Sequence, residues 1–288
     1  MKIAATGLSG LVGSRVEELL KDKYEFVSIG LSAGIDITNK DSIFQGVASS
    51  DADVVLNLAA KADVDGSEED KALGDAGPAW KLNVIGAENV ALACAHFGKR
   101  LIHISTDFVF DGEKNGYTEE DVPNPLNWYG KTKFEGERVI QKINGNFIIA
   151  RIAYPYRASY EKKDFFRTIL SKLEEGTHIS AVTDHVMTPT FIDDFAGVLS
   201  ILFERGEKGI YHVVGDSPIS PYEATLLICD KFGFDKKLVS KTTRAQYFAD
   251  RAVRPFGLFL KNDKIEELGA KMRTFAEGLD EIMRQRGI

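Results

Sequence analysis

Cysteines, long apolar runs and blocks of positive charge are scarce or missing in this sequence. The two cysteines, Cys94 and Cys229, lie within apolar helical patterns, so we expect a buried, reduced pair. No apolar run approaches the ~20 residues that a transmembrane helix needs, which argues against a membrane protein. The chain begins directly with a strand pattern, so we expect no signal peptide and a cytoplasmic location.

The charge balance argues against a further class of partner. Lys and Arg number 36 against 43 Asp and Glu, a formal net charge of -7 without any basic run, which disfavours non-specific binding of nucleic acid. An anionic small molecule is still compatible with this charge, because an acidic protein can contain a local cationic pocket. His96, His103, His178 and His212 show no metal-ligand spacing, so we predict structural roles for them and no metal site.

The first half of the 288-residue chain alternates short apolar runs with amphipathic stretches. We expect strands at residues 2–5, 25–29, 53–58, 101–105 and 147–152, and helices at residues 14–21, 83–97 and 129–142. This alternation predicts an α/β fold with a doubly wound parallel sheet of the Rossmann type.

The second half of the chain lacks this regular alternation. Apolar residues at helical spacing predict helices around residues 165–173, 195–202 and 275–283, and a short apolar run predicts a strand at residues 210–214. No clean linker separates the halves, so we expect a smaller α/β lobe packed tightly on the sheet.

A glycine-rich turn lies between the first expected strand and the first expected helix. Its spacing is G-x-x-G-x-x-G, and glycines there permit a tight turn, close approach of the backbone to a pyrophosphate, and close packing of the helix. The helix N-terminus adds free N–H groups and partial positive charge. We therefore predict a dinucleotide-binding turn made of Gly7, Ser9, Gly10, Leu11, Val12 and Gly13.

The choice between NAD and NADP stays open in the sequence. An acidic residue at the end of the second strand favours NAD and a basic one favours NADP, but residues 28–32 offer neither. Asp36 follows soon after. Its carboxylate can accept a hydrogen bond from the adenine amino group, or it can serve as a turn or cap residue before Thr38.

Tyr129 and Lys133 are four residues apart, so both project from one face of the expected helix. A nearby ammonium favours the ionised form of a phenol and makes it a better proton shuttle at neutral pH. Ser105 and Thr106 end the fourth strand, where open α/β sheets bind ligands. Thr106 can hydrogen-bond a carbonyl oxygen of a substrate while Tyr129 protonates it, or it can simply cap the strand end.

Several segments together carry a family resemblance. The chain resembles the extended short-chain dehydrogenases/reductases and, among them, the dTDP-4-dehydrorhamnose reductase family. The matching segments are the glycine turn and residues 36–39, 57–60, 62–65, 105–112, 125–133, 188–190 and 254–255.

The resemblance implies a catalytic triad of Thr106, Tyr129 and Lys133. Tyr129 protonates the C4 ketone oxygen of a nucleotide-linked sugar as hydride arrives from the nicotinamide. Lys133 holds the nicotinamide ribose and lowers the pKa of Tyr129, while Thr106 orients the ketone. The implied cofactor contacts beyond the glycine turn are Asp36, Ile37, Leu58, Ala59, Ala60, Lys61, Asn83, Ser105, Tyr129 and Lys133. The implied substrate contacts are Val64, Thr106, Phe108, Tyr154, His185 and Arg254.

Some substrate-side positions depart from the family pattern. Phe108 replaces a usual Tyr, Tyr154 followed by Pro155 stands where a Trp is common, and His185 replaces a Gln. The segment 70–80 is also longer than usual. An arginine such as Arg254 can fork onto a diphosphate or remain an ordinary surface residue. The reduction chemistry is therefore expected, and the sugar is left open.

These expectations define a domain division and a set of hypotheses. We predict an NAD(P)-binding domain of residues 1–157, to which residues 187–216 return, and a substrate lobe of residues 158–186 and 217–288. The leading hypothesis is an NAD(P)H-dependent reductase of a nucleotide-linked 4-keto-6-deoxy sugar, with a homodimer as the assembly to test. The alternatives are a nucleotide-sugar epimerase or dehydratase, and a non-catalytic NAD(P)-binding regulatory subunit like the methionine adenosyltransferase β subunit.

Overall fold

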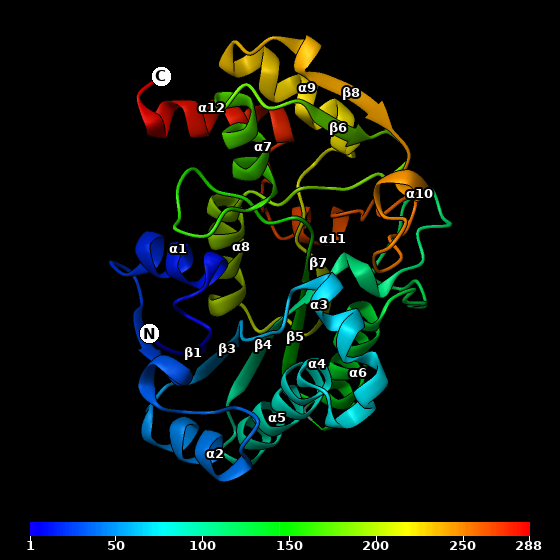
Figure 1. The fold of residues 1–288 in the computed structure, drawn as a ribbon. Helices are drawn as coiled ribbons and strands as arrows, with labels where there is room; N and C mark the ends of the chain where they lie inside the picture. The colour runs from blue at the N-terminus through cyan, green and yellow to red at the C-terminus, as the bar shows by residue number, and fades with distance from the viewer. Residues whose placement is uncertain (144) are drawn as a thin grey trace.

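A six-stranded parallel sheet forms the centre of the protein (Figure 1). The computed structural model describes residues 1–143 and 145–288. The strand order is β2-β1-β3-β4-β5-β7, and every neighbouring pair is parallel. The strands are β1 (Lys2–Thr6), β2 (Glu25–Ser28), β3 (Val54–Asn57), β4 (Arg100–Thr106), β5 (Phe147–Ile152) and β7 (Gly209–His212). The predicted Rossmann-type α/β fold is confirmed.

Helices cover both faces of this sheet, which is why its central strands are apolar on both sides. α1 (Leu11–Leu20) and α8 (Ile192–Glu204) bury their apolar residues in one core layer with β1, β4 and β5. α2 (Lys40–Ser49), α5 (Gly86–His96) and α6 (Trp128–Ile143) form the layer on the other face. The strand order reverses between β1 and β3, so the carboxyl ends of these strands border a crevice.

A smaller lobe lies above the carboxyl ends of the strands, at the top of Figure 1. β6 (Ile179–Val182) and β8 (Val239–Thr242) form a two-stranded parallel sheet. α7 (Phe165–Glu174), α9 (Pro221–Phe232) and α12 (Phe275–Arg286) pack with β6 around an apolar core of their own. Capping boxes begin both α9, at Ser220 and Glu223, and α12, at Thr274 and Glu277.

One segment of the predicted lobe packs elsewhere. α11 (Asp263–Glu266) contacts β7, and Ile265, Ala270 and Met272 are buried in the core of the main sheet. The segment lies there because its apolar residues contact the sheet. The predicted domain division stays a prediction.

All predicted strands are present, with small differences at their ends, whereas α9, β6, β8 and several shorter elements were not predicted. α1 begins at Leu11, inside the glycine turn, and a π-helical turn η3 (Lys81–Ile85) precedes α5. α2 was missed because Gly46 interrupts its buried stripe of Ile43 and Val47. The other short elements are α3 (Val64–Glu69), α4 (Pro78–Trp80), α10 (Arg244–Tyr247), η1 (Leu31–Ala33), η2 (Asp70–Ala76), η4 (Asp107–Val109) and η5 (Lys236–Leu238).

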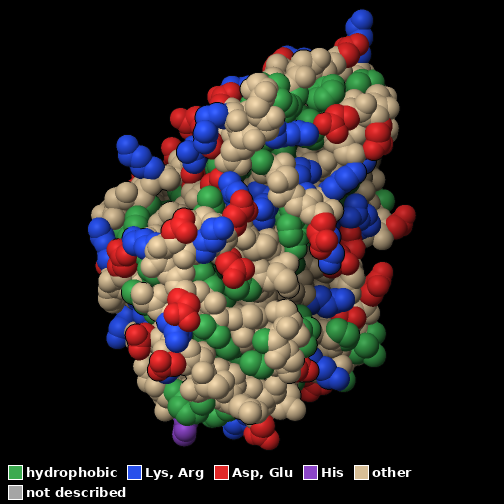
Figure 2. All heavy atoms as spheres, turned by 90° about the vertical axis from the view of Figure 1, so that its left-hand side faces the viewer, with side chains coloured by type: hydrophobic (Ala, Val, Ile, Leu, Met, Phe, Trp, Pro, Cys, Tyr) green, Lys and Arg blue, Asp and Glu red, His purple; other side chains and the backbone are tan. Residues whose placement is uncertain are grey.

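The distribution of surface charge and the state of the two cysteines are consistent with the composition. On the face shown in Figure 2, Lys and Arg side chains alternate with Asp and Glu, and no single sign dominates. Cys94 and Cys229 are both buried and free, as expected. Within residues 1–143 and 145–288, none of the helices has the length and apolar character needed to span a bilayer.

Candidate active site

A cavity of about 660 Å³ lies between the carboxyl edge of the sheet and the smaller lobe. Most of the residues predicted for the cofactor and the substrate meet around it. Those that line it are Gly7, Gly10, Leu11, Val12, Gly13, Leu58, Ala60, Val64, Ser105, Thr106, Phe108, Tyr129, Lys133, Tyr154 and Arg254. Ser9, Asp36, Ile37, Ala59, Lys61, Asn83 and His185 lie outside this lining.

The glycine turn is built so closely that side chains do not fit. Gly7 has φ +65°, and a Cβ there would lie 2.8 Å from the backbone nitrogen of Ala59. A Cβ on Gly13 would lie 2.6 Å from the carbonyl oxygen of Gly7. Gly10 precedes α1 in an extended conformation and donates a 3.0 Å hydrogen bond to that same oxygen. The turn thus leaves its concave side and the start of α1 open to a ligand.

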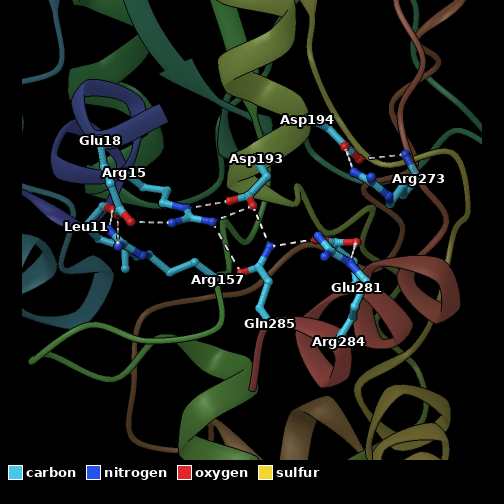
Figure 3. Close-up of polar contacts among 10 residues, drawn as sticks. All are labelled: Leu11, Arg15, Glu18, Arg157, Asp193, Asp194, Arg273, Glu281, Arg284 and Gln285. Carbon is cyan, nitrogen blue, oxygen red and sulfur yellow. Dashed lines mark hydrogen bonds and ion pairs between the residues drawn. The ribbon is translucent and has the colours of Figure 1, made fainter. Parts of the chain in front are cut away.

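A polar network holds α1 from behind (Figure 3). Arg157 follows β5 and donates to the carbonyl oxygen of Leu11 at 3.3 Å and to Ser14 Oγ at 2.9 Å. Arg15 forks onto the Asp193 carboxylate of α8 at 2.8 and 2.7 Å, and Gln285 of α12 donates to the same carboxylate at 2.7 Å. Because three helices share these contacts, the network couples the position of the turn to the smaller lobe.

Several residues that were predicted to bind the cofactor lie outside the cavity lining and make hydrogen bonds that stabilise the loops around it. Asp36 Oδ1 accepts from the backbone nitrogen of Thr38 at 2.9 Å and from its hydroxyl at 2.8 Å, which is the geometry of the turn-residue alternative. Asn83 exchanges two hydrogen bonds with the backbone of Lys61, at 2.9 and 3.1 Å, and donates to Thr132 of α6 at 3.0 Å. Asn83 therefore ties the loop after β3 to the helix that carries Tyr129.

The triad candidates converge at the floor of the cavity. Thr106 ends β4 and its hydroxyl donates to Asp107 Oδ1 at 2.9 Å. Tyr129 and Lys133 are one turn apart on α6, with 9% and 2% of their surfaces exposed. Helix α6 comes this near because Gly130 carries no Cβ, which would lie 2.2 Å from the carbonyl oxygen of Phe108.

Burial governs the protonation of Tyr129 in the ligand-free protein. It raises the pKa of Tyr129 to about 12, while a hydrogen bond with Thr106 opposes the shift. The lowering of this pKa by Lys133, which the family resemblance implies, stays a prediction. Lys133 Nζ donates to the carbonyl oxygen of Ile104 at 2.7 Å, and burial lowers the pKa of Lys133 to about 8.

An aromatic wall forms the substrate side. Phe108 packs edge-on against Tyr129, with ring centroids 5.8 Å apart, and lies 6.4 Å from the ring of Tyr154. His185 stands behind this wall, with Nε2 2.8 Å from the Tyr154 hydroxyl and Nδ1 2.7 Å from the carbonyl oxygen of Pro255. Tyr154 itself has φ 41°, a strained backbone conformation of the kind that clusters at functional sites.

The sequence did not reveal a pair of arginines that close the cavity. Arg251 and Arg254 both line it, and both bind the Asp65 carboxylate, with distances of 2.7 Å to Arg251 Nε and 2.6 Å to Arg254 Nη1. These contacts lower the pKa of Asp65 to about 2, chiefly through Arg254. Phe248 lies beneath the two guanidinium groups, 5.1 and 4.8 Å from its ring centre. Only Arg254 had a motif signal.

Asp107 is a second residue that sequence reasoning missed. It lines the cavity with 1% of its surface exposed, and its Oδ2 has no hydrogen-bond partner among the described residues. Burial raises the pKa of Asp107 to about 7. This oxygen is therefore free to meet a ligand hydroxyl. Its only sequence signal was its place directly after Thr106.

The raised pKa of Asp107 predicts a pH-dependent stability. Because the folded state binds this proton more tightly than the unfolded state, the stabilisation is complete below about pH 4 and disappears as the pH rises through about 7. Asp107→Asn removes the ionisation, so above about pH 8 the variant should have the higher Tm and below about pH 4 the advantage should vanish. Thermal unfolding across this range is the measurement, and parallel Tm profiles for the two proteins would contradict it.

Comparison with known proteins places the chain in a family. The model described as RmlD substrate binding domain matches residues 1–287. The chain belongs to this family. It is 33% identical to a dTDP-4-dehydrorhamnose reductase from Aggregatibacter actinomycetemcomitans over 92% of each chain. It is 31% identical to the methionine adenosyltransferase 2 subunit beta of Xenopus tropicalis, over 96% of this chain and 86% of that protein.

A solved structure agrees with this family. The dTDP-4-dehydrorhamnose reductase of Bacillus anthracis, crystallised in complex with NADP, superposes with a TM-score of 0.89 at 27% identity over 99% of both chains. The family predicted from the sequence motifs is therefore confirmed.

Proposed function

We propose that this protein is an NAD(P)H-dependent reductase of a nucleotide-linked 4-keto-6-deoxy sugar, acting like the dTDP-4-dehydrorhamnose reductases of its family. The observation that carries the proposal is that Thr106, Tyr129 and Lys133 lie around one cavity with the glycine turn. Fold alone does not specify a reaction, whereas this set of side chains suits proton delivery to a ketone beside a bound dinucleotide.

The residues present fit a nicotinamide dinucleotide. Gly7 and Gly13 shape a cradle that a Cβ would fill, and Ser105 Oγ is buried in the lining without a partner among the described residues. The glycine turn would hold the pyrophosphate at the start of α1. When bound, the reduced cofactor supplies the hydride. NADP and NAD are both compatible with the second strand, which ends in Ser28 and presents its hydroxyl 2.9 Å from that of Ser32.

The chain's own residues supply the proton and the orientation. Thr106 hydrogen-bonds the ketone oxygen, and Tyr129 donates its phenolic proton to that oxygen, which becomes a hydroxyl. The burial that raises the Tyr129 pKa keeps the phenol protonated before the reaction. Lys133 holds the cofactor ribose and stabilises the phenoxide that remains.

The nucleotide-sugar would lie between the aromatic wall and the arginines. Phe108 and Tyr154 offer apolar surface to the sugar ring, with Val64 beside them in the lining. Arg254 and Arg251 can fork onto the diphosphate, which would compete with Asp65 for the guanidinium groups. This arrangement gives an acidic protein a local cationic site.

The proposal is tested with purified protein, NADPH or NADH, and a panel of nucleotide-linked 4-keto-6-deoxy sugars. We expect net oxidation of the reduced cofactor with one member of the panel and formation of the 4-hydroxy sugar. An epimerase or dehydratase would recycle its cofactor, so product formation without net cofactor consumption would point to that alternative. Silence with every sugar and both cofactors would overturn the proposal.

A second candidate function is favoured by one observation, the 31% identity to the methionine adenosyltransferase 2 subunit beta. A non-catalytic subunit would bind NAD(P) and a partner enzyme without turnover. Stable co-purification with a partner, together with cofactor binding and no reduction of the sugar panel, would support it. A homodimer and a cytoplasmic location remain predictions from the sequence, and size-exclusion chromatography with light scattering tests the former.

A further inference from the structure

A row of buried polar side chains crosses the sheet beneath the cavity and ends at Lys133. Thr6 of β1, Asn57 of β3 and His103 of β4 are direct partners in the strand register. Thr6 Oγ1 lies 2.6 Å from Asn57 Oδ1, Asn57 Nδ2 lies 3.0 Å from His103 Nδ1, and His103 Nε2 lies 3.4 Å from Lys133 Nζ. At most 2% of any of these residues is exposed. Water therefore does not replace these contacts.

The hydrogen bonds along this row are all donated in one direction, from Thr6 toward Lys133. Thr6 Oγ1 accepts a hydrogen bond from the backbone nitrogen of Ala59 at 3.1 Å, so its own hydrogen is free to go to Asn57 Oδ1. With that oxygen occupied, the amide of Asn57 turns its N–H toward His103 Nδ1, which accepts. The opposite orientation of the Asn57 amide would point its N–H at the Thr6 oxygen and leave a buried hydroxyl hydrogen without an acceptor, which is costly.

The direction of the row sets the tautomer of His103. Burial and the neighbouring Lys133 hold the pKa of His103 well below its ordinary value, so the ring is neutral. A neutral imidazole carries one N–H, and since Nδ1 accepts from Asn57, the hydrogen is on Nε2. That N–H points at Lys133 Nζ.

This tautomer disfavours the charged form of Lys133. An ammonium has only donors, so an ammonium beside the His103 Nε2–H would place two donors face to face. An uncharged amine has a lone pair that accepts this hydrogen while another N–H of Lys133 still donates to the carbonyl oxygen of Ile104. A hydrogen bond to the neutral form of a group disfavours its charged form.

We propose that His103 is a positioning residue that holds Lys133 and lowers its proton affinity, and that Thr6 and Asn57 maintain the required tautomer. The inference rests on the proposed function, in which Tyr129 gives its proton to the ketone oxygen. In the ligand-free protein, the Lys133 ammonium loses a proton to water in the cavity that it lines. The amine that is left accepts from His103 through its lone pair, so charge and protons balance.

Other charged and titratable groups surround Lys133, and they act in known directions. Glu137, one turn further along α6, raises the pKa of Lys133, but it is itself paired with Arg151 of β5. Asp107 of η4 and Tyr129 of α6 line the same cavity as Lys133. Among the described residues, His103 is the side chain for which a hydrogen bond with Lys133 Nζ is found.

The first test needs no cofactor. NMR of the isotope-labelled ligand-free protein distinguishes the two neutral tautomers of His103 and follows the titration of Lys133, whose signal is assigned by its loss in Lys133→Met. We expect His103 to carry its hydrogen on Nε2 near neutral pH. A hydrogen on Nδ1 or a doubly protonated ring would overturn the proposal, whether or not the protein reduces any sugar.

Two variants test the effect on Lys133. His103→Phe removes the N–H, and Asn57→Leu removes the amide N–H that holds Nδ1 as the acceptor without adding a charge. Each should raise the midpoint of the Lys133 titration by roughly one pH unit, a tenfold rise in proton affinity. In the active enzyme, the pH profile of kcat should move in the same direction. The control is His96→Phe, since His96 is exposed at the end of α5 and its ring packs against Phe44 and Phe97.

The outcomes separate this inference from the proposed function. An unchanged Lys133 midpoint in folded His103→Phe and Asn57→Leu, or an equal shift in His96→Phe, would overturn the role of His103. A protein that shows the Nε2–H tautomer and both shifts yet reduces no sugar would retain the His103–Lys133 coupling and lose only the reductase assignment.

Discussion

Replacing Tyr129 with phenylalanine should lower kcat by about 10²–10⁴-fold, because the general acid for the ketone oxygen is lost. The substitution removes only the hydroxyl. The ring still packs edge-on against Phe108, so the wall of the cavity and the folding of α6 should be preserved. KM for the nucleotide-sugar and Kd for the cofactor should therefore change far less than kcat. Steady-state kinetics and cofactor titration of the purified variant measure these quantities.

Tyr156→Phe is the matched control for Tyr129→Phe. Tyr156 is fully buried in the smaller lobe, and its hydroxyl has no hydrogen-bond partner among the described residues. Removing that hydroxyl should leave kcat unchanged. A Tyr129→Phe variant that keeps more than about a tenth of the parental kcat would contradict the role of Tyr129, since general acid catalysis is worth more than that.

Replacing Glu137 with glutamine should lower the free energy of unfolding by about 3–5 kcal/mol, because it leaves a buried charge without its partner. Arg151 and Glu137 are 1% and 0% exposed, and the guanidinium forks onto the carboxylate at 3.0 and 2.7 Å. Neutralising one side leaves Arg151 in the core beneath the active site without a counter-ion. Denaturant unfolding followed by fluorescence or circular dichroism measures the loss.

Glu135→Gln controls for the substitution itself. Glu135 lies on the same helix, α6, and pairs with Arg138 at the surface, with side-chain exposures of 23% and 46%. An exposed pair one turn apart contributes roughly 0.5 kcal/mol or less, so this variant should unfold almost like the parent. Equal losses in the two variants would contradict a special role for the buried pair. Glu137→Gln should also lower the pKa of Lys133, the direction opposite to His103→Phe.

The local features of the site were readable in the sequence. The glycine turn was recognised because three glycines at fixed spacing stand between a strand pattern and a helix pattern, and Gly7 and Gly13 indeed leave no room for a Cβ. Tyr129 and Lys133 were paired correctly on one helix face because helical geometry places residues four apart side by side. Such predictions succeed where the contacts are set by spacing within one element.

The side-chain contacts between different secondary-structure elements were not predicted. Arg251 was overlooked because its partner Asp65 lies far away in the chain, and the tertiary fold alone brings both to the rim of the cavity. His185 was expected to contact the substrate, yet it lies outside the cavity lining and forms a hydrogen bond with the Tyr154 hydroxyl. Asp107 followed a recognised motif, but only burial shows that one of its oxygens is left without a partner.

The sequence by itself determined the alternation of strands and helices in the first half of the chain, the glycine turn between β1 and α1, and the position of Tyr129 and Lys133 on one helix face, because each depends on local periodicity or on a short motif. The tertiary structure alone decided the electrostatics around Tyr129. Burial raises the pKa of Tyr129, and the register of β1, β3 and β4 aligns Thr6, Asn57 and His103 toward Lys133. Desolvation and cross-strand register depend on what packs against a residue in space, and sequence spacing does not contain that information.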